Sequence, residues 1–263
     1  MQIKVETNLP QIANAMRRAA SQVPFAASVA LNKTAERGRV DVVANMRRVF
    51  DRPTPFVLNS LRIKRATKTA LVAEVAFKDK NSAESSRSMV EPHIFAGKRR
   101  YKGMEARLYR ARLLPEGWNA VPGAGAKLDA YGNMSRGQIT QMLNVLGTYT
   151  EAGYNKADAR TRARLAKGNV KKNVYGFVYW VNPAVGSGRR KHLQPGIYQR
   201  VTTAFGSSLK PIVIFVKRVN YRARLPFYRL VESAAAKHFA PEFDKAFEAA
   251  LQTAFPKIQG QLL

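Results

Sequence analysis

The chain has 263 residues, and its 45 lysines and arginines against 17 aspartates and glutamates give a formal net charge of +28 at pH 7. Such a charge repels itself in a compact monomer, so we expect a negatively charged companion: nucleic acid, an acidic membrane surface or an acidic protein. A hydrophobic content of 46% indicates a folded core, and the absence of cysteine excludes disulfides and cysteine-ligated metals. No apolar run approaches the roughly 20 residues that cross a bilayer, and the first residues lack a signal-peptide pattern. We therefore do not expect a membrane among the partners of the chain.

The first 49 residues predict a short strand at 3–5 and then two helices. Asn8 is a suitable cap for the first helix. The apolar stripe of this helix consists of Leu9, Ile12, Ala13, Met16 and Ala20. Val23-Pro24 is expected to end it and to begin a second helix. The inner face of that second helix is dominated by small residues, which let another helix or subunit approach closely, and consists of Ala27, Leu31, Thr34, Gly38, Val42, Asn45 and Val49.

The next segments predict a pair of strands. Prolines in 50–56 end the second helix, and apolar residues then alternate with polar ones over 61–64 and again over 71–77. Residues 78–88 are polar and are expected to form a loop.

Residues 93–169 differ in character, because basic clusters, glycines and prolines interrupt short periodic pieces. Within them, 104–114 and 135–146 predict helices, and 115–133 predicts a long irregular segment. We interpret 93–169 as a basic insertion lobe attached to an α+β core made of residues 1–92 and 170–263.

The core then resumes with three strands, at 173–181, 197–203 and 211–216, of which the first is apolar on both faces, as a central strand is. Two further helices follow, with Pro241 between them. This order predicts an α+β fold: a mostly antiparallel sheet packed by N-terminal and C-terminal helices. The expected core anchors are Phe215, Phe227, Leu230, Phe243 and Phe247.

No catalytic or metal-binding pattern stands out. Glu91-Pro92-His93 could give two ligands without a third, and is better explained as a surface loop. His192 belongs to a basic loop, and His238 lies on the apolar face of a helix. The glycines of 122–129 lack the spacing of a phosphate-binding loop. We therefore expect no enzyme, no cofactor and no metal.

Several basic runs are candidates for contact with a polyanion or an acidic partner. A single such run is usually a solvated face, but several in a chain of +28 favour a polyanionic environment. The candidate contact residues are Lys98, Arg99, Arg100, Lys102, Arg160, Arg162, Arg164, Lys167, Lys171, Lys172, Arg189, Arg190, Lys191, Lys217, Arg218, Arg222 and Arg224. No motif for reading a base sequence accompanies them.

Three segments, 23–43, 61–77 and 221 onward, resemble the minor tail protein Z family of tailed bacteriophages. The resemblance rests on Ala30-Leu31-Asn32-Lys33 in the helix and on Lys64-Arg65-Ala66 in the strand. Residues 192–227 are also similar to tail-completion and head–tail joining proteins of phages. The segment 93–169 is longer than in compact members of the family.

This resemblance implies a structural protein of the virion, assembled in the host cytoplasm as a homo-oligomeric ring around the DNA path. Its partners would be adjacent tail, neck or portal proteins. The basic loops 97–112, 160–172 and 186–191 would either hold DNA or, as we favour for most of them, pair with acidic neighbouring subunits. The alternative is a non-specific nucleic-acid-binding protein.

Overall fold

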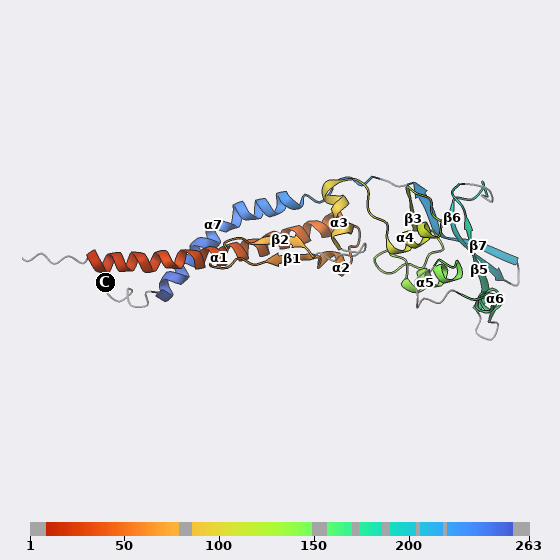
Figure 1. Cartoon of the computed structure of the whole chain (residues 1–263), viewed down its shortest axis with the longest axis horizontal. Coiled ribbons are helices and arrows are strands. Elements are labelled where there is room, and N and C mark those ends of the chain that lie inside the picture. The colour runs from red at the N-terminus through yellow and green to blue at the C-terminus, as the bar shows by residue number, and fades with distance from the viewer. Residues whose placement is uncertain are drawn as a thin grey trace, which may run out of the picture. The chain divides into compact units, whose positions relative to one another are not determined.

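The chain is an α+β protein, shown as a computed structural model in Figure 1, and the predicted fold class is confirmed. It forms two compact units: residues 1–79 with 223–263, here called the helical unit, and residues 80–222, here called the sheet unit. The structure describes residues 9–78, 86–148, 157–169, 174–185, 190–203, 206–217 and 220–254.

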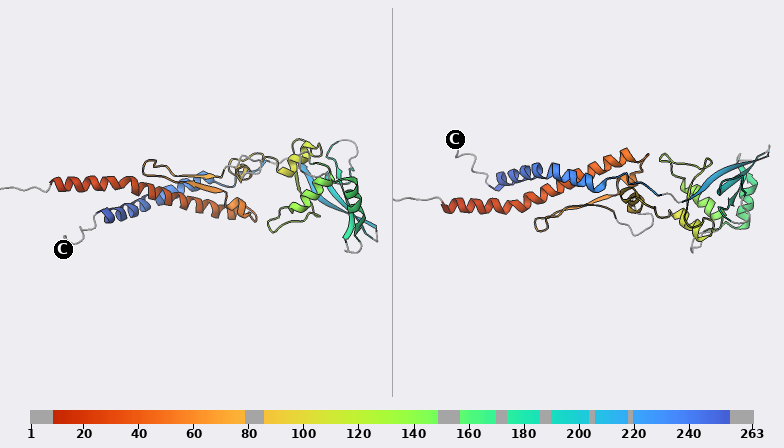
Figure 2. Two further views of the ribbon diagram at one scale, coloured as in Figure 1. Left: turned by 60° about the horizontal axis from the view of Figure 1, so that its bottom comes forward. Right: turned by 90° about the horizontal axis from the view of Figure 1, so that it is seen from above.

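Two long helices form the body of the helical unit. Helix α1 (Leu9–Val49) and helix α7 (Phe227–Ala254) lie side by side and run in opposite directions (Figures 1 and 2). An ion pair between Lys33 and Glu242 joins them, with 3.2 Å between Nζ and Oε2. At Gly38, a Cβ atom would stand 3.5 Å from the Cβ of Ala234, so the absent side chain lets the two backbones come close. The small-residue face predicted for this part of α1 therefore receives α7.

Neither proline ends its helix, in contrast to the sequence prediction. Pro24 lies inside α1, and Pro241 lies inside α7. A proline within a helix removes one backbone hydrogen bond and costs about 3 kcal/mol, but its φ angle is itself helical. Buried residues begin two positions after Pro24, at Ala26, and buried alanines lie on both sides of Pro241 at positions 234 and 246. Packing of the two helices offsets the missing bonds.

A small sheet completes the helical unit. Its elements are α2 (Pro55–Leu58), β1 (Leu61–Lys64) and β2 (Glu74–Phe77). The two strands pair antiparallel with Leu61 opposite Phe77, and both contact α1. The predicted pair of strands is therefore present, but the second strand begins at Glu74 and not at residue 71, and Leu71 is exposed. The ring of Phe77 lies 5.2 Å from that of Phe227, which connects this sheet to the first turn of α7.

Asn32 fastens α1 to the segment that follows β1. Its Nδ2 donates to the carbonyl oxygen of Ala66 at 3.0 Å, and its Oδ1 accepts from the N–H of the same residue at 2.8 Å. One turn along the helix, Glu36 pairs with Arg65 at 2.9 Å. The side chain of Asn32 thus satisfies both polar groups of one backbone residue, which holds the strand connection in a single position.

The sheet unit contains a five-stranded sheet in the order β3-β7-β6-β5-β4, with every neighbouring pair antiparallel. Its helices are α3 (Ser86–Phe95), α4 (Gly103–Arg110), α5 (Arg136–Val145) and α6 (Ala159–Lys167). Its strands are β3 (Trp118–Pro122), β4 (Gly168–Asn169), β5 (Val174–Asn182), β6 (Gly196–Thr203) and β7 (Gly206–Lys217). Helices α4 and α5 contribute Leu108, Met142 and Leu143 to one core with Tyr179 and Val213 of the sheet.

The division into units differs from the predicted one. Strand β3 pairs with β7 along one edge of the sheet, and β4 pairs with β5 along the other. The segment 93–169 therefore supplies both edge strands and much of the core of the sheet unit, and is not a lobe attached to it. The predicted core of 1–92 and 170–263 is likewise split, because 223–263 returns to the helical unit.

Two predicted loops contain regular structure instead. Residues 118–122, expected to be irregular, become a strand through pairing with β7. Glu91, Pro92 and His93, expected in a loop, lie in α3, where His93 contacts the ring of Tyr221 at 5.1 Å. The predicted helix after Ser135 is confirmed, with Ser135 accepting a cap hydrogen bond from the N–H of Gln138.

The expected core anchors are buried to different degrees. Phe215 is buried in the sheet unit and Phe227 in the helical unit, whereas Leu230, Phe243 and Phe247 are half-buried. Phe243 and Phe247 stack at 5.7 Å between ring centroids.

We expect Asn32→Ala to lower the free energy of unfolding by about 1–2 kcal/mol, because both backbone groups of Ala66 lose their partner. Urea unfolding of the full chain measures this change. Asn14→Ala, at an exposed position of the same helix, is the control and should stay within about 0.5 kcal/mol of the parent. Equal effects at the two positions would show that the hydrogen bonds from Asn32 to Ala66 do not contribute to the free energy of unfolding.

Candidate functional site

The positive charge is concentrated in the sheet unit. That unit carries 26 lysines and arginines against 7 aspartates and glutamates, whereas the helical unit carries 19 against 10. A surface that meets a polyanion or an acidic protein is therefore to be sought among the cations of the sheet unit.

The first group of cations lies on residues 97–102, here called the basic loop. The loop begins at Gly97, whose N–H donates to the carbonyl oxygen of Tyr221 at 3.0 Å and whose own carbonyl accepts from the N–H of Tyr221 at 2.8 Å. Gly97 has a φ of +102°, a conformation that glycine adopts without strain. The loop ends at Lys102, the residue that precedes α4.

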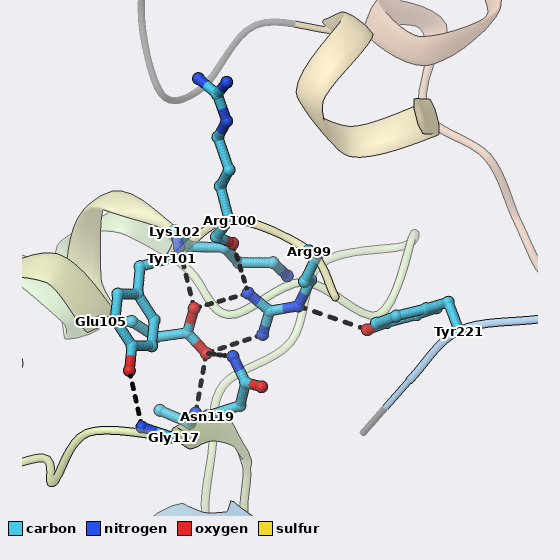
Figure 3. Close-up of polar contacts among 9 residues, drawn as sticks. Arg99, Arg100, Tyr101, Lys102, Glu105, Gly117, Asn119 and Tyr221 are labelled. Atoms are coloured by element: carbon cyan, nitrogen blue, oxygen red, sulfur yellow. Dashed lines mark hydrogen bonds and ion pairs between the residues drawn. The ribbon is translucent and has the colours of Figure 1, made fainter. Parts of the chain in front are cut away.

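Glu105 holds the basic loop in place (Figure 3). Its carboxylate is fully buried and receives two hydrogen bonds from Arg99, at 2.6 Å from Nη1 to Oε2 and at 2.7 Å from Nη2 to Oε1. The backbone N–H groups of Lys102 and Ala120 donate to it at 2.8 and 2.7 Å. Nδ2 of Asn119 adds a longer bond of 3.2 Å. One carboxylate therefore joins the loop, α4 and β3.

Both members of the Arg99–Glu105 pair stay charged. Burial alone would raise the pKa of Glu105, but the hydrogen bonds from Arg99 and from the N–H groups of Ala120 and Lys102 outweigh it and hold this pKa below its usual value. Burial would also lower the pKa of Arg99, and the bond to Glu105 reverses that effect, so this pKa is raised. Arg99 further donates through Nε to the hydroxyl of Tyr221 at 3.3 Å.

Arg99 is therefore an internal brace and does not present its charge to a partner, in contrast to its place among the predicted contact residues. The other three cations of the loop, Lys98, Arg100 and Lys102, are exposed. In Figure 3 the side chain of Arg100 points away from the Glu105 cluster. The brace thus fixes the backbone from which these three charges project.

Helix α6 carries the second group of cations. Asp158 caps the helix by accepting from the N–H of Thr161 at 2.7 Å. Arg160, Arg164 and Lys167 are exposed and share one face, because they are spaced by four and three residues. Arg162 is exposed on another face of the same helix.

A glycine lets α6 lie close to the sheet. A Cβ at Gly176 of β5 would collide with the carbonyl oxygen of Ala166, so only glycine allows this approach of α6 to the strand. The two groups of cations stand at opposite edges of the sheet: the basic loop is tied to β3, and α6 runs directly into β4.

The remaining predicted contact residues do not form a third group. Arg190 covers the ring of Trp180 at 5.2 Å, a cation–π contact, and Lys191 and Lys217 are exposed. Arg222 is exposed in the sheet unit, and Arg224 is exposed in the helical unit. Lys171, Lys172, Arg189 and Arg218 lie outside the described residues.

The described part of the chain contains no group of three or more histidine, aspartate or glutamate side chains that could hold a metal. The glycine-rich turn after β3 is a structural feature, because Gly123 and Gly125 donate to the carbonyl oxygens of Ile212 and Pro211 at 2.9 and 2.8 Å. Within the described residues, no helix is both long and apolar enough for a bilayer.

Comparison with known proteins adds no identity: no protein-family model, curated protein or solved structure matches the chain.

Sequence reasoning missed Glu105, Asn119 and Tyr221. One signal was present, since Lys102 and Glu105 have the spacing of a capping box, in which the third helical residue reaches back to the cap. An acidic residue at that position within a basic run could have been recognised as the partner of a nearby arginine. The roles of Asn119 and Tyr221 depend on strand pairing and have no local signal.

We expect Glu105→Gln to lower the stability of the sheet unit by about 3–5 kcal/mol, because it leaves the largely buried guanidinium of Arg99 without its counter-charge. Calorimetric or thermal melting of the full chain measures the loss. Glu116→Gln removes the same charge at an exposed position of the same unit and should have little effect.

The parent should also lose stability in acid. Since folding lowers the pKa of Glu105, its contribution is complete above the usual glutamate range, near pH 4.3, and declines as the pH falls through the folded value. Glu105→Gln should lack this component of the pH dependence. An identical acid dependence in both proteins would contradict the assigned role of Glu105.

Proposed function

We propose that the protein is a structural subunit of a tailed-bacteriophage particle, of the tail-completion or head–tail joining type, and not an enzyme. The observation that carries the proposal is the set of exposed cations held at two edges of the sheet unit, which has few acidic residues to neutralise them. Such a surface requires counter-charge from outside the chain, as a subunit enclosed by neighbours obtains.

The segments that carry the family resemblance also support the proposal. Asn32 of the helix segment holds the backbone of Ala66 in the strand segment, and Arg65 pairs with Glu36. The two motifs are 34 positions apart in sequence. Their residues form one contact, which gives a physical reason for them to occur together.

In a homo-oligomeric ring, each subunit meets one neighbour through one surface and a second neighbour through a different surface. Because the basic loop and α6 are both cationic, two copies that met through the β3 and β4 edges would bring like charges together. These two edges therefore suit contact with proteins other than this chain, and acidic faces of adjacent tail, neck or portal proteins would supply the counter-charge.

A second candidate is non-specific nucleic-acid binding. It is favoured by Arg160, Arg164 and Lys167, which form an exposed row of cations along α6. In that case the log of the affinity for duplex DNA falls linearly with the log of the salt concentration, with a slope of roughly −0.9 per phosphate contacted.

The decisive experiment locates the chain in purified particles by cryo-electron microscopy and mass spectrometry. We expect it near the head-proximal end of the tail, in several symmetry-related copies. Absence from infectious particles would refute the proposal, and salt-dependent DNA binding by the purified chain would then support the second candidate.

Charge reversal tests which cations matter. We expect Lys98→Glu and Arg100→Glu together to abolish incorporation into particles while leaving the melting temperature nearly unchanged, because the two side chains are exposed. The matched control reverses two exposed cations of α7, Arg229 and Lys237, and should incorporate normally. Equal loss in both variants would point to net charge alone.

A further inference from the structure

The first part of α1 has an apolar face that the described chain leaves uncovered. From Gln11 to Phe25 no side chain of α1 is buried, and the first buried one is Ala26. Residues 9–23 are here called the arm. Its exposed apolar side chains include Leu9 at 65%, Ile12 at 44%, Met16 at 69% and Val23 at 40% exposure.

These side chains continue the face that packs on α7. Leu9, Ile12, Met16, Ala19 and Val23 follow one another at intervals of three and four residues, and the same spacing leads on to Ala26 and Ala30, which are fully buried. The last turn of α7 stops beside the end of the arm. There, Gln22 and Phe25 line an open groove of about 440 Å³ with Ala250 and Ala254 of α7.

The arm continues a longer helix, so it needs no nucleation of its own. Most helical stability in proteins comes from packing of an apolar face, however, and this face has no packing partner among the described residues. The uncovered stretch is about 21 Å long at 1.5 Å per residue. A partner of similar length and apolar character would stabilise it.

We propose that the arm of a second copy of this chain covers it, so that the purified protein forms a dimer through two arms. The uncharged flanks of the stripe permit this partner. Residues beside the stripe, at positions 13, 15, 20 and 22, are three alanines and a glutamine, so no like charges meet across the contact. Arg17 and Arg18 lie on the other side of the helix.

The pairing is also self-complementary. Identical stripes related by a two-fold axis place each apolar residue of one arm against the other arm, and alanines at the flanks let the helices come close. A two-fold contact pairs subunits without closing a ring, so this dimer is the form of the free chain before any assembly. The inference does not rest on the proposed function.

Cross-linking tests the contact directly, because the chain has no cysteine of its own. Met16 stands at the middle of the stripe, so in a dimer the two Met16 side chains lie within about one helical turn of each other whichever way the arms run. Met16→Cys should therefore give a covalent dimer with a short bis-maleimide reagent. Asn14→Cys, exposed on the opposite side of the same arm, should not.

Sedimentation velocity supplies the second measurement. Met16→Glu places two like charges in the apolar contact and should raise the dimer dissociation constant at least about tenfold, whereas Asn14→Glu should leave it unchanged. Both positions are exposed, so neither change should affect folding. Added salt should strengthen the dimer, since two copies of charge +28 repel each other less when screened.

Three results would overturn the inference: a parent chain that stays monomeric at all concentrations, a Met16→Cys variant that does not cross-link, or equal cross-linking from Asn14→Cys. If the parent is monomeric and deletion of residues 255–263 produces a dimer, the last residues of the same chain cover the arm instead. All these measurements use purified protein, so they are independent of whether the chain belongs to a phage particle.

Discussion

A carboxylate with no exposed surface must find its hydrogen bonds inside the protein, and Glu105, on α4, receives them from the basic loop and from β3. Arg99 and the N–H of Lys102 come from the basic loop, and the N–H of Ala120 comes from an edge strand. If the loop left this position, the buried carboxylate of Glu105 would lose the hydrogen bonds from Arg99 and Lys102 and would keep only part of its donors. The direction in which Lys98, Arg100 and Lys102 project is thus decided by an acidic residue that no partner can touch.

Two neighbouring arginines that look alike in the sequence have different roles in the structure. Arg99 forms an internal ion pair, in which the two Nη atoms of its guanidinium bind the two carboxylate oxygens of Glu105. Arg100, one residue later, is exposed. Not every cation in a basic run is therefore available to a partner. Here the buried Glu105 pairs with Arg99 and leaves the neighbouring cations exposed.

Local patterns predicted those elements whose stability is local, or whose apolar faces repeat regularly. The cap at Ser135, the alternation in β1 and the apolar runs of β5 to β7 are of this kind. The continuity of α1 and α7 through their prolines could not be predicted, because it depends on packing between segments about 200 residues apart. Strand β3 is defined by its pairing with β7, and local composition indicates only a turn-rich segment.

The division into units and the candidate site likewise depend on contacts between distant segments. Nothing within residues 223–263 indicates that they pack on α1 rather than on the sheet that precedes them, and the Asn32–Ala66 contact joins positions with no shared local pattern. At the candidate site, the exposed cations could be found by counting charges. Their assignment to two edges of a sheet required the strand order. The exclusion of Arg99 from the exposed cations required its contacts with Glu105.

The net charge of the chain couples the two proposed contacts, one made by the cations of the sheet unit and one made by the arm. Two copies of a chain with 28 surplus positive charges repel, and this repulsion opposes any apolar contact between their arms. An acidic partner or polyanion bound to the sheet unit removes part of that repulsion, so it must strengthen association between copies. By thermodynamic linkage, association must strengthen binding of the acidic partner by the same factor. Under both proposals, a chain built this way associates most readily where its counter-charge is present, which favours assembly on an acidic surface over aggregation in free solution.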